Sequence, residues 1–581
     1  MEDTFQELKN LNSLKDVVND RFEKFNDRIA FLDKDGSSNY KEITYIDLKG
    51  KINSFGTVLL EKFHLNGKKI AVIGENSYRW YITYMATICG VGIIVPLDKE
   101  LPSNEILNLI KRSDAKCIVY SSRREELINQ IKDELDEDMI YINMNMKEHS
   151  ECTFSFDQLI EEGKEMIKSG DRNYLDAIVE KEEFRILLFT SGTMSTSKGV
   201  MLSHKNLIAN TLACYKLVPQ VGSFTFISVL PIHHTYEFSL TYLYATCMGA
   251  KVGICEGLKY MSKNIKEIKP DILIVVPAII ERVNQKIEKS IQDSGKEKAI
   301  SFAKKITNGL SKIGIDLRRI VFKKIQENFG GNLKYLLCGA APLDKELIQK
   351  MEAYGFIFMQ GYGATEASPL ISATTLDNRV AGTVGKAVYG TELRIDLSGN
   401  EDENSNIGEI ITKGDNIMIG YYQDEKKTAE ALRKGWFYTG DLGYFDMHGN
   451  LVVTGRSKNV IVTSNGKNIY PEEIENEINK ISLVKESMVY GKKDKKNKQE
   501  LIVTARVTLD KEYLEETYGK KKPTDKEIYN MIWNEIKKIN RSMVSYKAIK
   551  KLEVKNEDFV KTTTLKIKRL EEIEKNTGKR K

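Results

Sequence analysis

The sequence predicts an α/β protein with a large N-terminal domain and a smaller C-terminal domain, on the basis of three observations. Between about residues 68 and 276, short apolar runs alternate with stretches of helical periodicity. Between about residues 410 and 463, the chain is rich in β-branched residues and glycine turns, which is typical of antiparallel strands. The length of 581 residues exceeds what one hydrophobic core usually holds, so more than one domain is expected.

The alternating region is predicted to form largely parallel sheets. Residues 70–74 and 92–96 are expected to be strands, and residues 77–88 between them a helix. Because these strands are apolar along their whole length, both faces of the sheet should be covered by helices. Further strands of this type are predicted at residues 117–120, 185–189, 226–230 and 272–276.

A charged helical insert is predicted at about residues 281–330. Five apolar residues recur there at helical spacing, with lysines between them: Ile300, Ala303, Ile306, Leu310 and Ile313. A helix that lies on a membrane surface or binds a partner fits this pattern. A solvated insertion that packs on the domain also fits, and it is the favoured interpretation because charged runs usually form solvated faces.

The last part of the chain is predicted to be a domain of its own. Asn465 and Gly466 form a hairpin-turn signal between two β-branched runs. Pro471 and the two glutamates after it predict the start of a helix, because proline is tolerated in the first turn and glutamate complements the helix dipole. A boundary near Gly455 and Arg456 then gives two domains, at residues 1–455 and 456–581.

Composition excludes several classes of protein. The 88 basic and 82 acidic residues are spread along the chain, so no nucleic-acid partner is expected. The seven cysteines form no Cys-x-x-Cys pair, which predicts buried free thiols and no structural zinc. No secretory signal begins the sequence and no apolar run approaches about 20 residues, so a cytoplasmic protein is expected.

The loop at residues 190–199, Thr-Ser-Gly-Thr-Met-Ser-Thr-Ser-Lys-Gly, follows an apolar strand and carries the strongest functional signal. Glycine lets the backbone approach an anion, N–H groups and hydroxyls surround phosphate oxygens, and a lysine offsets their charge. The Gly-Lys-Ser/Thr of a Walker A loop is missing, and a flexible surface loop would fit this stretch taken alone.

Four further motifs accompany this loop. They are Leu-Pro-Ile-His-His-Thr-Tyr-Glu at 230–237, Gln-Gly-Tyr-Gly-Ala-Thr-Glu at 360–366 preceded by Cys-Gly-Ala-Ala-Pro at 338–342, Trp-Phe-Tyr-Thr-Gly-Asp-Leu-Gly at 436–443 with Gly-Arg-Ser-Lys-Asn at 455–459, and Lys-Thr-Thr-Thr-Leu-Lys-Ile-Lys-Arg at 561–569. In this order and spacing the chain resembles the adenylate-forming superfamily of acyl-CoA synthetases, luciferases and peptide-synthetase adenylation domains. The helical insert, Gly435-Trp436 and Ser-Asn-Gly-Lys-Asn at 464–468 make it most similar to the long-chain fatty acid–CoA ligases.

The resemblance implies an N-terminal domain of mostly parallel sheets flanked by helices plus a distorted β-barrel, and a small mobile α+β C-terminal domain. It implies ATP-dependent activation of a medium- or long-chain fatty acid to an acyl-adenylate, with pyrophosphate release, followed by transfer to CoA. Mg²⁺ would be the metal, and fatty acid and CoA the partners. The protein would be cytoplasmic and a monomer or homodimer, and peripheral contact at the inner face of a membrane stays open.

The resemblance also implies residue roles in the N-terminal domain. Ser191, Gly192, Thr193 and Lys198 would hold the β- and γ-phosphates, after Thr190. Glu366 would carry magnesium, with Thr365 on the α-phosphate, and His234 would lie near the entry for carboxylate and thiol. The adenine would be lined by Gly339, Ala340 and Ala341 and by the backbone of Gly361, Tyr362 and Gly363, with Tyr362 stacking on it.

In the C-terminal part, Asp441 would accept hydrogen bonds from the ribose hydroxyls, and Arg456 would support the same ribose. Lys566 would reach the α-phosphate and carboxylate oxygens during adenylation. Lys458 aligns with the hinge of the family. After rotation about that hinge, the hairpin around Gly466 would replace Lys566 and line the pantetheine tunnel.

The sequence departs from the family pattern at four positions. Ser195 and Ser197 replace a glycine and a proline of the phosphate loop, and Val560 and Leu565 replace a proline and a glycine near Lys566. Two alternatives therefore stay open beside the CoA ligase. One is ligation to an acyl carrier protein or adenylation without CoA, and the other is a catalytically degenerate sensor of nucleotide or lipid. The charged groups that the chemistry needs are all present, which favours the enzyme.

Overall fold

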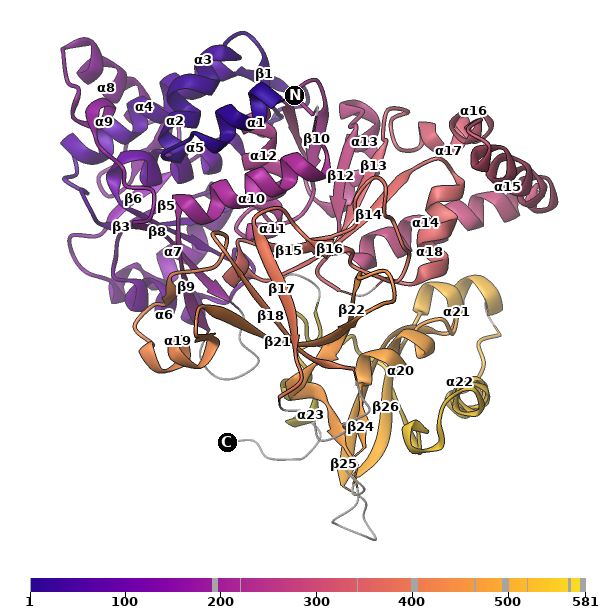
Figure 1. The fold of residues 1–581 in the computed structure, drawn as a ribbon. Helices are drawn as coiled ribbons and strands as arrows, with labels where there is room; N and C mark the ends of the chain where they lie inside the picture. The colour runs from indigo at the N-terminus through magenta and orange to yellow at the C-terminus, as the bar shows by residue number, and fades with distance from the viewer. Residues whose placement is uncertain are drawn as a thin grey trace. The chain divides into compact units, whose positions relative to one another are not determined.

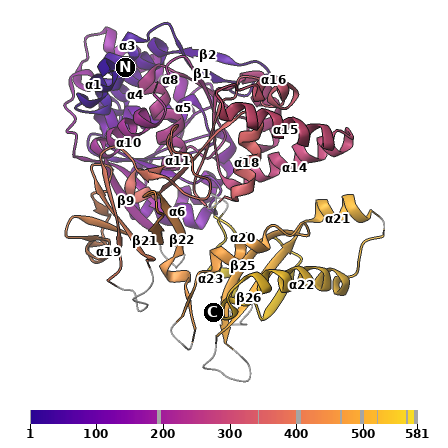
Figure 2. The ribbon, with the colours of Figure 1, turned by 45° about the vertical axis from the view of Figure 1, so that its right-hand side comes forward.

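The computed structural model describes residues 2–190, 197–219, 221–341, 343–398, 406–463, 467–493, 501–519, 521–562 and 566–574. The chain forms two compact units, which are described one at a time (Figures 1 and 2). The first holds residues 1–192, 196–392 and 413–435, and the second holds residues 393–412 and 436–581. The predicted division at 455/456 stays a prediction.

The first unit contains an eight-stranded sheet in the order β19-β9-β8-β4-β3-β5-β6-β7. The neighbouring strands from β4 through β3, β5 and β6 to β7 are parallel, and so are β4 and β8. Strand β9 is antiparallel to both β8 and β19. The strands are β3 (Lys69–Ile73), β4 (Ile93–Leu97), β5 (Ala115–Tyr120), β6 (Ile140–Asn143), β7 (Phe154–Ser155), β8 (Phe184–Thr190), β9 (Lys198–Ser203) and β19 (Gly420–Tyr421). The parallel strands predicted here are confirmed.

Helices cover this sheet because their apolar faces are buried against it. The helix α6 (Ser103–Ser113) buries Ile106, Leu109 and Ile110 in one cluster with residues of β3, β4 and β5. The helix α5 (Tyr78–Ala86), predicted at 77–88, begins at the N-cap Ser77, whose side chain accepts a hydrogen bond from Trp80 N.

A nine-stranded sheet, β16-β15-β14-β13-β12-β10-β11-β1-β2, forms the other half of this unit. The six strands from β14 to β1 are parallel, whereas β2 at one end of the sheet and β15 and β16 at the other pair antiparallel with their neighbours. The strands are β1 (Ile29–Asp33), β2 (Lys41–Thr44), β10 (Thr225–Ser228), β11 (Lys251–Ile254), β12 (Ile272–Val275), β13 (Tyr335–Cys338), β14 (Ile357–Gly363), β15 (Leu370–Ala373) and β16 (Lys386–Ala387). The carboxyl ends of β12, β13 and β14 therefore lie side by side.

The region predicted to be a helical insert is helical. It consists of α14 (Pro277–Asp293), α15 (Glu297–Lys312), α16 (Arg318–Val321) and α17 (Lys323–Glu327). The predicted apolar face is only partly buried: Ile306 and Ile313 are exposed, whereas Thr307 is buried. The period of the apolar residues is right, but the face that packs on the domain is turned away from Ile306 and Ile313.

The second unit begins with antiparallel strands, as predicted for residues 410–463. Strands β17 (Thr391–Asp396), β18 (Gly408–Gly414), β21 (Trp436–Phe445) and β22 (Leu451–Arg456) lie side by side. The distorted barrel that the resemblance implies for the N-terminal domain stays a prediction. The short strands β23 (Ile461–Val462) and β24 (Asn468–Ile469) then pair as the predicted hairpin.

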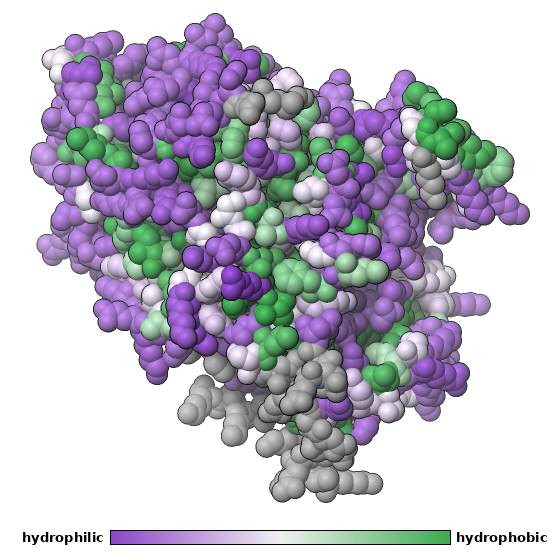
Figure 3. Space-filling view, in the orientation of Figure 1, coloured by the Kyte–Doolittle hydropathy of each residue, from purple (hydrophilic) through white to green (hydrophobic). Residues whose placement is uncertain are grey.

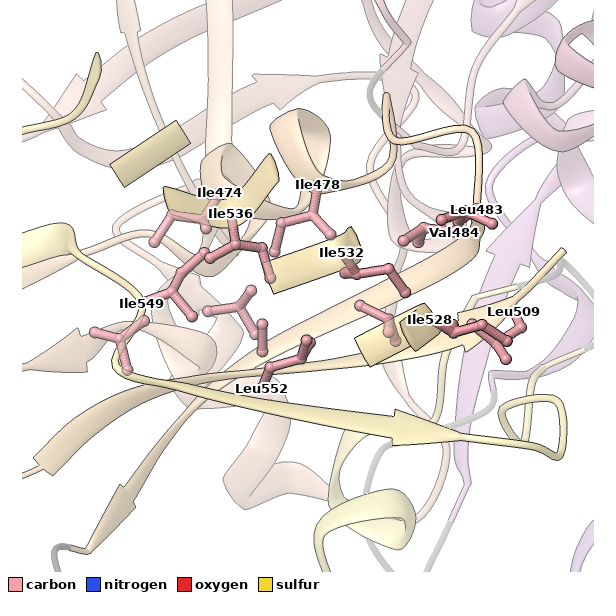
Figure 4. Close-up of a cluster of buried hydrophobic side chains, with 14 of the residues drawn as sticks. Ile474, Ile478, Leu483, Val484, Leu509, Ile528, Ile532, Ile536, Ile549 and Leu552 are labelled. Atoms are coloured by element: carbon pink, nitrogen blue, oxygen red, sulfur yellow. The ribbon is translucent and has the colours of Figure 1, made fainter. Parts of the chain in front are cut away.

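The rest of the second unit is α+β, with a three-stranded sheet of β25 (Val484–Lys493), β26 (Leu501–Leu509) and β27 (Lys551–Lys555). The predicted helix α20 (Pro471–Ile478) begins at Pro471, and α22 (Asp525–Ser542) turns Ile528, Ile532 and Ile536 inward. Figure 4 shows these isoleucines packed with Ile474 and Leu552 in one buried cluster. The remaining helices are α21 (Lys511–Tyr518) and α23 (Arg569–Glu574).

Two predictions drawn from composition can be compared with this fold. No helix in the described parts of the chain is both long and apolar enough to cross a bilayer. All seven cysteines are described and free, as expected, and six of them are buried. Cys152 is exposed, because it lies in the loop between β6 and β7, so the prediction of burial is wrong for this residue.

Candidate active site

Two glycine loops meet at the carboxyl ends of β13 and β14. Cys338 lies opposite Gln360 in the parallel register, so Gly339 and Gly361 follow on neighbouring strands. A Cβ atom on Gly339 would lie 3.2 Å from the carbonyl oxygen of Gly361. The two predicted adenine-lining segments are therefore adjacent, at the edge where open α/β sheets bind ligands.

The backbone of both loops is unusual. Ala340 has φ of 72°, a left-handed conformation that residues with a Cβ rarely adopt and that is concentrated at functional loops. A Cβ on Gly363 would lie 1.9 Å from the carbonyl oxygen of Pro369, so only glycine fits there. Ala341 is exposed and Tyr362 is half-buried. Their contact with adenine stays a prediction.

A chain of hydrogen bonds joins Lys198 to Glu366. Lys198 Nζ donates to the hydroxyl oxygen of Tyr421 at 3.2 Å, and this hydroxyl donates to Glu366 Oε1 at 2.9 Å. The Lys198 ammonium also lies 4.3 Å from the centroid of the Tyr421 ring, within cation–π range. Three elements bring these side chains together: the start of β9, the end of β19, and the 3₁₀ turn η7 (Thr365–Ala367) after β14.

Tyr421 is a site residue that the sequence interpretation missed. It is buried, and burial together with the negative charge of Glu366 raises the pKa of its hydroxyl above the ordinary value. The hydroxyl therefore stays protonated and keeps donating to Glu366. No sequence pattern marks Tyr421, because it reaches Lys198 only through the antiparallel pairing of β19 with β9.

Glu366 could hold a magnesium ion together with phosphate oxygens. Within the described residues, no three histidine, cysteine, aspartate or glutamate side chains gather into a metal cage. Mg²⁺ commonly binds through one or two carboxylates plus substrate phosphates, and Glu366 supplies a hard carboxylate oxygen of that kind. Thr365 precedes it in the same turn and is half-buried. The donor set therefore fits the metal that the resemblance implies.

The two ends of the predicted phosphate loop lie next to each other on neighbouring strands. Thr190 ends β8 and pairs in register with Lys198 at the start of β9. The loop residues Ser191, Gly192, Thr193 and Ser195 lie outside the described residues, so their roles stay predictions.

Arg112 on α6 contacts the second end of this loop and was also missed from the sequence. Its Nη2 atom donates to the carbonyl oxygen of Ser197 at 2.8 Å, and its guanidinium lies 5.3 Å from the centroid of the Phe189 ring. Ser197 replaces a proline of the family pattern. Arg112 therefore holds the backbone at a position where the family has a rigid residue.

An apolar cavity begins at the same strand edge. It has a free volume of about 40 Å³, whereas a single water needs roughly 10–15 Å³ on the same measure. Gly361 and Cys338 lie at one end, and Phe226 and Tyr244 line it nearer the amino ends of the strands. Tyr244 donates its hydroxyl hydrogen bond to the carbonyl oxygen of Val218 at 2.5 Å. A long acyl chain would therefore have to displace side chains to enter.

The motif at 230–237 places two adjacent histidines in different environments. Burial, followed by the positive charge of Lys99, lowers the pKa of His233 to about 3, so this imidazole is neutral. His234 is the N-cap of the short helix α11 (Thr235–Glu237) and is half-buried. Burial raises the pKa of Glu237, which ends the motif, to about 8. The predicted role of His234 stays a prediction.

In the second unit, Asp441 and Arg456 lie opposite each other on β21 and β22. Arg456 Nε lies 3.0 Å from Asp441 Oδ1, and the Asp441 side chain is largely buried whereas that of Arg456 is mostly exposed. Thr439 Oγ1 accepts a hydrogen bond from the Asp441 backbone N–H. The two residues predicted to serve the ribose are thus brought together, and their role stays a prediction.

Lys566 and Lys458 are both exposed. Lys566 N donates to Thr562 Oγ1 at 3.1 Å, and Thr562 N donates to the carbonyl oxygen of Lys566 at 2.8 Å. The two residues that the predicted motif spaces four apart are thus hydrogen-bonded to each other, and Leu565 lies outside the described residues. Lys458 lies in the 3₁₀ turn η8 (Ser457–Asn459) directly after β22. Gly466 also lies outside the described residues.

Two family models match the chain. A family model described as "AMP-binding enzyme" matches residues 18–422, which is more than half of the chain, and "AMP-binding enzyme C-terminal domain" matches residues 458–581. The chain belongs to the AMP-binding enzyme family. Membership confirms the resemblance to adenylate-forming enzymes that the five motifs carry.

This AMP-binding enzyme is 28% identical over 484 residues to the mouse (Mus musculus) long-chain-fatty-acid–CoA ligase 5, a match that covers 78% of the chain and 69% of the relative. It is 26% identical over 551 residues to the chloroplastic long-chain-fatty-acid–[acyl-carrier-protein] ligase AEE15 of Arabidopsis thaliana, covering 82% and 74%. The crystal structure of the anthranilate CoA ligase AuaEII in complex with anthranoyl-AMP superposes with a TM-score of 0.78 at 18% identity, covering 97% of each chain. This likeness confirms the predicted fold class.

Proposed function

We propose that this AMP-binding enzyme is a long-chain fatty acid–CoA ligase that forms AMP. The proposal is supported by curated relatives named as long-chain-fatty-acid–CoA ligases, such as the mouse protein. Its substrates would be ATP, CoA and a medium- or long-chain fatty acid. The observation that carries the proposal is the Lys198–Tyr421–Glu366 chain, which provides one cation and one carboxylate for a polyphosphate and a metal.

The proposed first step is adenylation. A carboxylate oxygen of the fatty acid attacks the α-phosphorus of ATP, the bond from that phosphorus to the bridging oxygen breaks, and pyrophosphate leaves. Lys198 would offset charge on the β- and γ-phosphates, and Tyr421 would hold Lys198 and Glu366 in place. Mg²⁺, when bound, neutralises further charge on the phosphate oxygens.

The proposed second step transfers the acyl group to a thiol. The sulfur of CoA attacks the acyl carbonyl carbon, and the thiol proton is released to solvent. The bond from that carbon to the phosphate oxygen breaks, and AMP leaves with this oxygen and the electron pair of the bond. The apolar cavity lined by Gly361, Phe226 and Tyr244 would accept the alkyl chain, because apolar surface is removed from water there. His234 would lie near the entry for carboxylate and thiol.

The remaining roles proposed belong to the second unit. Asp441 and Arg456 would bind the ribose, and Lys566 would supply positive charge to the α-phosphate during adenylation. Lys458 would serve as the hinge, and the hairpin around Gly466 would line the path of the pantetheine arm. We also propose that the enzyme works in the cytoplasm as a monomer or homodimer, with peripheral contact at the inner face of a membrane.

Ligation to an acyl carrier protein is a second candidate. The Arabidopsis thaliana relative, which is about as similar in sequence as the mouse protein, is named as an acyl-carrier-protein ligase. This name supports acyl carrier protein as an alternative acceptor. The adenylation step would be the same for both acceptors. Only the thiol that attacks the adenylate differs.

Pyrophosphate release with acids of increasing chain length, with CoA, with acyl carrier protein or with neither, tests the proposal. We expect release that requires a fatty acid, and acyl-CoA as the product when CoA is present. Glu366→Gln should lose this activity, because it removes the carboxylate charge without changing the shape of the side chain. Acyl transfer to the carrier protein alone would favour the second candidate, and no release with any fatty acid would contradict both.

A further inference from the structure

The outer face of the helical insert exposes large apolar side chains. Phe302 is 67% exposed, Ile306 46% and Ile313 72%. These residues are four and seven positions apart, so they lie on one face of α15 and its C-cap. The neighbouring helix α16 adds Ile320 and Val321, which are also exposed. We call these five residues the outer stripe.

The stripe is unusual for a surface helix, because such a helix usually turns its large apolar residues inward. On the inner face of α15, Thr307 is buried and Ala303 and Leu310 are half-buried, whereas Phe302 and Ile306 face outward. In Figures 1 and 2, α15 and α16 lie side by side at an edge of the first unit. Figure 3 shows green, apolar residues gathered over the same two helices. A continuous exposed apolar surface of this kind marks a site of interaction.

Positive charge is concentrated on the same insert. Residues 281–330 hold 12 basic and 6 acidic residues, and the whole chain holds 88 and 82. The rest of the chain therefore holds 76 of each sign, so the excess of six positive charges comes entirely from the insert. Lys298 and Lys305 are exposed and flank Phe302 at helical spacing, four positions before it and three after it.

Apolar residues bordered by lysines are complementary to the surface of an anionic bilayer. Interfacial helices bury an apolar face at the boundary between headgroups and acyl chains, while basic residues along its border contact anionic headgroups. A second copy of the chain fits less well, because two inserts meeting face to face would oppose two positively charged surfaces. A nucleic acid would leave the apolar stripe uncovered.

We propose that the outer stripe, with Lys298 and Lys305, docks the protein on the surface of an anionic lipid bilayer, an inference that rests on the peripheral membrane contact proposed above. Phe302, Ile306 and Ile313 enter the interfacial region, and the lysines contact the headgroups. This surface belongs to the first unit and is separate from the candidate active site. It therefore gives the enzyme access to a phase in which fatty acids concentrate, without occupying any residue of the site.

Vesicle sedimentation with the full-length protein, without ATP or fatty acid, tests the docking surface directly. We expect binding to vesicles of phosphatidylcholine with phosphatidylglycerol, and at least tenfold weaker binding to phosphatidylcholine alone. Binding should also weaken in 1 M salt, where the Debye length falls to about 3 Å. The double variant Phe302→Asp, Ile306→Asp should bind at least tenfold more weakly, and so should Lys298→Glu, Lys305→Glu.

Ile178→Asp is the matched control, since Ile178 is 84% exposed in the first unit and stands outside the insert. It should bind as the wild type does, and circular dichroism should show all variants folded. Phe302→Trp provides a second measurement, because its fluorescence should be quenched by brominated lipids. Wild-type binding by the double aspartate variant, or a concentration-dependent dimer in ultracentrifugation that this variant abolishes, would overturn the proposal.

Discussion

Replacing Tyr421 by phenylalanine isolates the hydroxyl that joins Lys198 to Glu366. The ring and its cation–π contact at 4.3 Å stay, whereas the hydrogen bonds of 3.2 Å and 2.9 Å are lost. A hydrogen bond to a charged group contributes about 1.5–3 kcal/mol. Since Lys198 and Glu366 are only half-buried, water or substrate can replace part of what the two hydrogen bonds contribute. We therefore expect the stabilisation of the transition state to fall by about 1.5–3 kcal/mol in total.

A loss of that size corresponds to a fall of about 10- to 100-fold in kcat/KM for ATP, measured as pyrophosphate release at varied ATP. The melting temperature should change little, because Phe has almost the same shape as Tyr. Tyr422→Phe is the matched control on the next residue: its hydroxyl accepts a hydrogen bond from Gln423 Nε2 at 3.2 Å, at an exposed position. If Tyr421→Phe keeps kcat/KM within twofold of the control, the hydroxyl has no role in holding Lys198 and Glu366.

Three other perturbations test separate parts of the molecule. Burial raises the pKa of Glu237 from 4.5 to about 8, so the folded protein holds a proton that the unfolded chain has released between these values. Stability should therefore fall as the pH rises through this window, by up to ~1.4 kcal/mol per pH unit, and melting curves of Glu237→Gln should show a flatter pH profile. Arg569 pairs with the buried Glu475, so Arg569→Ala should destabilise the protein by about 3–5 kcal/mol in denaturant unfolding, and adding Glu475→Gln should restore part of that loss. Tyr244→Ala should lengthen the cavity, so kcat/KM should rise by about fourfold for each extra methylene of the acid. If the dependence of kcat/KM on chain length is unchanged, the acyl chain does not bind in this cavity.

The strands of the first unit could be predicted because each is apolar along its length. Ile272–Val275, for example, is buried at every position, so its sequence carries the evidence for a sheet covered on both faces. The hairpin and the helix at Pro471 were predictable for a local reason, since turn and cap residues act on their immediate neighbours. Local chemistry and burial therefore account for most of the correct predictions.

The parts that could not be predicted depend on contacts between distant segments. Tyr421 lies 223 residues from Lys198 in the chain, and Arg112 lies 85 residues from Ser197. Neither contact leaves a pattern in the sequence around it. The insert shows a different limit: periodicity gives the spacing of Ile306 and Ile313, but the helices that pack against α15 decide which face points outward.

The distribution of thiols makes the chain suited to selective labelling. Burial raises the pKa of the six buried cysteine thiols, for example to about 12 at Cys89 and Cys214. These thiols are therefore both shielded and un-ionised at neutral pH. Cys152 alone among the seven is exposed. A maleimide dye should therefore attach to one position of the unmodified protein. A second dye on one cysteine introduced in the C-terminal part would then report distance changes between the two units during turnover.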